Sequence, residues 1–126
     1  MIDGTTEAKD FDKTEENKAY VKQFGEDIFV SGKIEKLPDY LSDNYIQHNP
    51  NLGDGLQGLR AGMPRPPQGQ APQRPVQFDT IHMVLGEGNF VLLVSEGKFF
   101  GNHSAFYDLF RVERDASGNK KIAEHW

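Results

Sequence analysis

One acidic residue stands inside an otherwise apolar run, Phe106-Tyr107-Asp108-Leu109-Phe110-Arg111-Val112. Strand alternation predicts that Asp108 shares a face with Phe106 and Phe110, while Tyr107, Leu109 and Arg111 point the other way. Apolar surroundings disfavour the ionised form of a carboxyl, so such an aspartate can take or give a proton near neutral pH. It could instead pair with an arginine or cap backbone groups at a bulge. Asp108 is the first candidate catalytic residue.

A histidine ends a short extended segment, Tyr45-Ile46-Gln47-His48-Asn49-Pro50. The Asn49-Pro50 step restricts the backbone that follows. His48 could therefore orient a substrate carbonyl, or relay a proton with Asp108. Alternatively, it supports the fold through a hydrogen bond to the next turn, and Asn49 braces that turn. His48 is the second candidate catalytic residue.

The chain closes on Ala123-Glu124-His125-Trp126. Successive residues of a strand point to opposite faces, so His125 and Trp126 cannot both face one interior. Trp126 is expected to be packing or pocket wall, and His125 is a candidate second polar group.

The remaining titratable residues give weaker signals. His82, and His103 with Tyr107, lie on predicted strands, but no histidine pair has the short spacing of helical or hairpin metal sites. No metal or other cofactor is predicted, although a metal site assembled from distant strands stays open. Arg60, Arg65 and Arg74 cluster around a proline-rich stretch, where they could attract an anionic substrate or simply solvate a loop.

Composition excludes several classes of function. The chain has 126 residues, a net charge of -5, and no basic stripe, so we expect one domain that does not bind nucleic acid. Cysteine is absent, which excludes disulfide and thiolate chemistry. The first residues lack the apolar core of a signal peptide, and no apolar run could span a bilayer. We therefore expect a cytoplasmic protein that does not enter a membrane.

Helical patterns come first along the chain and strand patterns follow. Residues 1–13 read as a flexible tail, and a helix runs from Thr14 toward Gly32. A helix from about 55 to 63 and a proline-rich surface loop over 64–75 are predicted next. Four strand-like runs cover 76–85, 90–100, 103–114 and 120–126. This order predicts an α+β fold with helices packed on one face of an antiparallel sheet.

Three of these pieces, together with Asp54-Gly55-Leu56-Gln57-Gly58, give the chain a resemblance to a known family. The His48 segment, the Asp108 strand and the His125-Trp126 ending resemble the SnoaL-like polyketide cyclases of the nuclear transport factor 2-like superfamily. The family's terminal His-Trp-Asp is matched only through Trp126. The resemblance covers residues 14–126 and implies a strongly curved, cystatin-like sheet wrapped around a long first helix as a cone. It also implies a homodimer.

In that family the acid/base carboxylate lies on a late strand, and ketosteroid isomerases of the same superfamily place an aspartic acid of a comparable strand in the oxyanion hole. The resemblance therefore implies a pocket at the mouth of the cone. Its expected lining is Phe24, Tyr45, Phe106, Phe110, His125 and Trp126.

Three functional hypotheses follow. The first is cofactor-free acid/base catalysis on a small carbonyl compound, in which Asp108 moves the proton and His48 helps hold the enolate. Aldol-type cyclisation, isomerisation and hydration all need one positioned carboxyl in a dry pocket. The second is a domain that binds a small apolar molecule without turnover. The third is an interaction domain that dimerises through Tyr107, Leu109 and Arg111.

Overall fold

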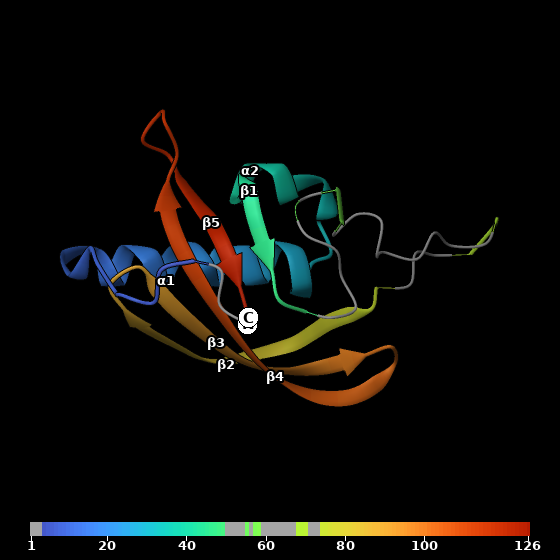
Figure 1. The fold of residues 1–126 in the computed structure, drawn as a ribbon. Helices are drawn as coiled ribbons and strands as arrows, with labels where there is room; N and C mark the ends of the chain where they lie inside the picture. Colours follow the sequence, from blue (N-terminus) through green and yellow to red (C-terminus); the bar gives the residue numbers. More distant parts are fainter. Residues whose placement is uncertain (1–3, 50–54, 56, 59–67, 71–73) are drawn as a thin grey trace.

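The structure is a computed structural model that describes residues 4–49, 55, 57–58, 68–70 and 74–126. Helices form one layer and a five-stranded sheet forms the other (Figure 1). The predicted α+β class is therefore confirmed. The predicted helix over 55–63 and the loop over 64–75, with Arg60 and Arg65, lie largely outside the described residues.

The first helix supplies the main apolar face of the helical layer. α1 (Thr14–Gly25) continues into a π-helical turn, η2 (Glu26–Val30), and Gly32 follows with a φ of 68°. Val21, Phe24 and Ile28 recur at helical spacing and are buried against the sheet. The Arg74 guanidinium donates to the carbonyls of Phe29 and Val30, which satisfies groups that the end of a helix leaves open.

Three short helical elements complete this layer. η1 (Phe11–Lys13) precedes α1, while η3 (Ile34–Lys36) and α2 (Leu37–Tyr40) precede the first strand. Proline is tolerated in the first turn of α2 because its missing N–H has no partner there. The carboxylate of Asp27 accepts hydrogen bonds from Tyr40 and Lys36, at 2.7 and 3.0 Å, and so ties α2 and η3 to η2.

The sheet has the order β1-β5-β4-β3-β2 and is not closed. β2 (Val76–Glu87), β3 (Phe90–Phe99), β4 (Asn102–Arg114) and β5 (Lys120–His125) form an antiparallel meander, as predicted. β1 (Leu41–Gln47) pairs with β5 in parallel, so the prediction of a purely antiparallel sheet is wrong. The reason is that β1 leaves α2, which packs against β5, and then runs along β5 in the same direction.

Residues 4–10 are attached to the sheet, although the sequence predicted a flexible tail over 1–13. The backbone N–H of Lys9 donates to Asn89 Oδ1 at 3.0 Å, and the N–H of Asn89 donates back to the Lys9 carbonyl at 2.9 Å. Asn89 is fully buried at the β2–β3 hairpin. These contacts are hydrogen bonds of the backbone and of an amide side chain. Hydrophobic periodicity therefore could not predict that the segment packs on the sheet.

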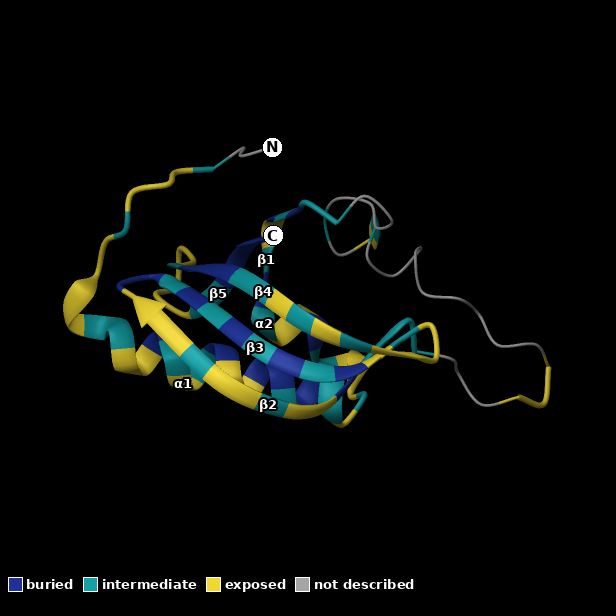
Figure 2. Cartoon of the chain, turned by 90° about the horizontal axis from the view of Figure 1, so that it is seen from below, coloured by how far each residue is buried: buried dark blue, intermediate teal, exposed yellow. Residues whose placement is uncertain are grey.

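The face of the sheet opposite the helices carries a large apolar surface. Met83, Leu85 and Tyr107 are 52%, 51% and 69% exposed, and β2 is exposed along most of its length (Figure 2). Among the described residues, none of the helices is long and apolar enough to cross a membrane.

Candidate functional site

A cavity of about 280 Å³ lies between the helical layer and the inner face of the sheet. Its wall combines aromatic rings from α1, η2, β1, β3 and β4 with a smaller group of polar side chains. Of the residues predicted to line a pocket or to act in it, Phe24, Tyr45, Phe106, Phe110, Asp108 and His125 lie in this wall. The other described lining residues are Phe29, Gln47, Asn49, Val76, Phe99, Ser104 and Ala105.

Asp108 and His125 form a pair in the cavity wall. Asp108 Oδ1 lies 2.8 Å from His125 Nε2, while Asp108 Oδ2 is buried and has no hydrogen-bond partner. The imidazole stacks on Phe110, with ring centroids 4.5 Å apart and planes 10° apart. Phe110 and His125 are partners in the β4–β5 register, so the sheet itself sets this stacking. One carboxylate oxygen is therefore held in place, and the other is buried without a protein partner.

Alternate residues of β1 and its extension complete the polar part of the wall. The Gln47 side-chain amide donates to Tyr45 Oη at 2.8 Å, and Gln47 Oε1 accepts the Asn49 backbone N–H at 3.1 Å. Gln47 was not among the predicted site residues, and Asn49 was expected to brace a turn. Counting in twos from Tyr45 along the predicted extended segment would have found both.

His48 belongs to a different cluster, on the opposite side of β1 and β5. His48 Nε2 lies 2.7 Å from Glu124 Oε1, and its ring stacks on Trp126 at 5.1 Å. The predicted relay between His48 and Asp108 is replaced by two separate pairs, His48–Glu124 and Asp108–His125. The physical reason is alternation, because His48 follows Gln47 and Glu124 precedes His125 on their strands.

A buried ion pair anchors this second cluster. Arg111 donates from Nε to Glu124 Oε2 at 3.0 Å and places Nη2 2.9 Å from the same oxygen, and it also pairs with Glu113. The backbone N–H of Gly4 donates to Glu124 Oε1. Burial raises the pKa of Glu124, but the hydrogen bonds from His48 and Arg111 outweigh it and hold that pKa below its ordinary value. Arg111 was predicted to be outward and available to a partner; it is 7% exposed and engaged.

The other sequence candidates lie away from the cavity. His82 and His103 flank Glu96 on the exposed face, with nitrogen–oxygen distances of 3.4 and 3.7 Å. Arg74 is bound to the end of η2. In the part of the chain that the structure describes, no group of three or more histidine, aspartate or glutamate side chains is placed to hold a metal ion.

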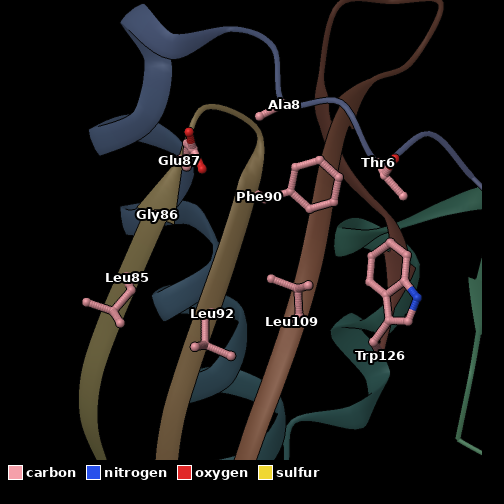
Figure 3. A pocket seen from close by; sticks show the side chains of 9 residues that line it. All are labelled: Thr6, Ala8, Leu85, Gly86, Glu87, Phe90, Leu92, Leu109 and Trp126. Carbon is pink, nitrogen blue, oxygen red and sulfur yellow. The ribbon is translucent and has the colours of Figure 1, made fainter. Parts of the chain in front are cut away.

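A second hollow, of about 690 Å³, lies on the outer face beneath the N-terminal segment (Figure 3). Leu85, Leu92 and Leu109 are register partners across β2, β3 and β4, and Trp126 exchanges backbone hydrogen bonds with Leu109. Trp126 therefore lines this outer groove, on the opposite face from His125. Thr6, Ala8, Gly86, Glu87 and Phe90 complete its lining. Glu87 is the one titratable group among these lining residues, so the groove has no acid/base pair.

A search of known protein-family models finds none that matches the chain. A search of curated proteins likewise finds no significant match.

Proposed function

We propose that the protein is a cofactor-free acid/base enzyme that acts on a small carbonyl compound in the inner cavity. The observation that carries this proposal is the state of the Asp108 carboxyl. One oxygen is fixed by His125, while the other is buried, without a partner, in a mostly aromatic wall. A buried acceptor of this kind is costly unless a ligand supplies a donor or a transferable proton.

The chemistry begins with a proton on a carbon next to the carbonyl. Asp108 Oδ2 removes that proton, the C–H electron pair forms the enolate, and negative charge builds up on the carbonyl oxygen. Tyr45 and Gln47, which hydrogen-bond to each other, lie in the same wall, so the enolate would form beside the polar part of the cavity. His125 keeps the carboxyl oriented. Return of the proton to another carbon gives isomerisation, and attack of the enolate on a second carbonyl gives aldol cyclisation. In hydration, water adds to an alkene conjugated with the carbonyl, and the enolate that results takes its proton back from Asp108.

We further propose that the chain is a SnoaL-like member of the nuclear transport factor 2-like superfamily, with its cone-shaped fold. The order of helices before a strand meander supports this assignment, as does a cavity enclosed between α1 and the sheet. In this proposal His125 takes the role beside Asp108 that was predicted for His48. His48 instead supports the fold through Glu124.

Exchange of carbon-bound hydrogen tests the proposal directly. A panel of small ketones in D2O is followed by proton NMR with the wild-type protein, with Asp108→Asn, and with Asp39→Asn as a control at an exposed aspartate. The wild type and Asp39→Asn should accelerate deuterium uptake, and Asp108→Asn should lose about 10²–10⁴-fold of that acceleration. Equal rates for Asp108→Asn and wild type would refute the role of Asp108.

A binding domain without turnover is the second candidate function, favoured by the predominance of aromatic rings in the cavity wall. Mass spectrometry of the purified protein distinguishes the two. A small apolar molecule that copurifies with both wild type and Asp108→Asn, with no hydrogen exchange by either protein, would favour binding alone.

We also propose that the partner of the outer face is a second copy of the chain. Two rows of register partners, Met83–Val94–Tyr107 and Leu85–Leu92–Leu109, form an apolar surface of the kind that marks an interface. Sedimentation equilibrium should show a dimer for wild type and for Gln23→Lys on the exposed helix face. Tyr107→Lys should shift the equilibrium toward monomer. A monomeric wild type at micromolar concentration would refute this proposal.

A further inference from the structure

We infer that the inner cavity selects a neutral ligand of one or two rings that carries a hydrogen-bond donor, and that it rejects carboxylates and phosphates. This inference rests on the proposed function, since it names the substrate class of the same site. Three features of the cavity lead to it: its charge, its unpaired acceptor and its size.

Charge comes first. Among the described residues that line the cavity there is no lysine or arginine, and the one carboxyl is Asp108. A ligand anion beside Asp108 Oδ2 would meet a like charge inside a wall of low polarity, where repulsion is poorly screened. Arg74, one of the arginines that the sequence predicted could attract an anionic substrate, is occupied with the carbonyls of Phe29 and Val30. The described wall therefore holds no permanent cation to compensate a ligand anion, and its one imidazole, that of His125, is already paired with Asp108.

The unpaired oxygen defines what a good ligand must present. Asp108 Oδ2 has no donor, while Oδ1 is bound to His125. A hydroxyl, an amide N–H or an enol O–H would satisfy Oδ2, and such a group is uncharged at neutral pH. A ligand that offers neither such a group nor an acidic C–H next to a carbonyl, such as an aryl ether, would leave this oxygen unsatisfied. The cavity should therefore prefer phenols, enols and amides over their methylated forms.

The size of the cavity is set by aromatic side chains that pack against one another in its wall. The cavity volume of about 280 Å³ lies just below the range of about 300–1,000 Å³ that drug-sized ligands occupy. Phe24 contacts Phe29 and Phe110 edge-on, each with centroids 5.5 Å apart, and is itself only 2% exposed. Moving this wall outward would disrupt the core around Phe24. A cavity of about 150 Å³ already holds benzene, so this one has room for one or two rings, and three or more fused rings should fit poorly.

Matched probes test charge, donor and size separately. Binding of 4-hydroxybenzamide, 4-hydroxybenzoate, 4-methoxy-N,N-dimethylbenzamide and 6-hydroxyanthracene-2-carboxamide to the wild-type protein is measured at pH 7 by ligand-observed NMR. The hydroxybenzamide should bind at least tenfold more tightly than the benzoate. It should also bind more tightly than the methoxy compound, which has no N–H or O–H donor, and than the three-ring anthracene amide. In Asp108→Asn the preference over the benzoate should shrink to within about threefold.

Several outcomes would overturn the inference. These are a benzoate that binds as well as the benzamide, an anthracene amide that binds better than the single-ring amide, or no saturable binding by any probe up to millimolar concentration. Phe106→Ala provides a second check, because shortening this half-buried wall residue should improve binding of the anthracene amide relative to hydroxybenzamide. The binding measurements need no turnover. Selective binding without hydrogen exchange would therefore refute the catalytic proposal alone, and exchange without the predicted selectivity would refute this inference alone.

Discussion

Removal of Arg111 should be one of the most damaging single changes in this protein. Arg111→Met keeps the apolar stem of the side chain but leaves Glu124, which is fully buried, without its guanidinium. Breaking a buried ion pair from one side typically costs about 3–5 kcal/mol, because the remaining charge has lost its partner. His48 and the Gly4 N–H still contact Glu124, so we expect about 3 kcal/mol. For a domain of this size that corresponds to a fall in Tm of roughly 12 °C.

Urea unfolding at pH 7 measures this cost, with Arg114→Met as the matched control. Arg114 is 48% exposed and lies 4.0 Å from Glu16, so its loss should cost less than about 1 kcal/mol. The double variant Arg111→Met/Glu124→Leu removes both charges and should be more stable than Arg111→Met alone. The reasoning fails if Arg111→Met costs no more than Arg114→Met, or if the second substitution only adds to the loss.

Three further predictions concern stability. Hydrogen bonds from Tyr40 and Lys36 lower the pKa of Asp27 to about 2. The ionised carboxylate therefore stabilises the fold above about pH 4, and this stabilisation is lost as pH falls toward about 2. Urea midpoints between about pH 4 and about pH 2 should change less in Asp27→Asn than in wild type, and identical pH profiles would contradict this. Gly97→Ala should lower the free energy of unfolding by at least about 1–3 kcal/mol, because the new Cβ would lie 1.9 Å from the backbone oxygen of Gln77. Thermal unfolding measures this loss. An unchanged Tm would count against the close approach of β2 and β3. Ser95→Ala should be neutral or slightly stabilising in urea, because the buried hydroxyl has no partner; a loss above about 1 kcal/mol would reveal one.

Local patterns explain why much of the fold was predictable. The strands β2 to β5 follow from alternation and turn residues, and α1 follows from apolar spacing with a glycine at its end. β1 was predicted only over 45–48, whereas it begins at Leu41. Its pairing with β5 joins segments far apart in the chain, and no local pattern carries that information. The N-terminal segment was missed for a related reason, since its partner Asn89 lies on a distant hairpin.

The site shows both the use and the limit of alternation. Strand alternation applied to β5 predicts that His125 and Trp126 point to opposite faces of the sheet, and the structure places them there. The same rule applied from Tyr45 would have placed His48 opposite Tyr45, with Gln47 on the cavity side. What the sequence alone could not give is the partner of each charged group. Asp108 meets His125 and Arg111 meets Glu124 only through the register of β4 against β5.

The parallel pairing of β1 with β5 also bears on how such a protein can change over evolution. β1 carries Tyr45 and Gln47 into the cavity, and among the described strands it neighbours β5 and no other. A substitution on β1 therefore disturbs the pairing of one neighbouring strand only. New substrate preferences could arise at its cavity-facing residues while the Asp108–His125 pair, held between β4 and β5, stays fixed.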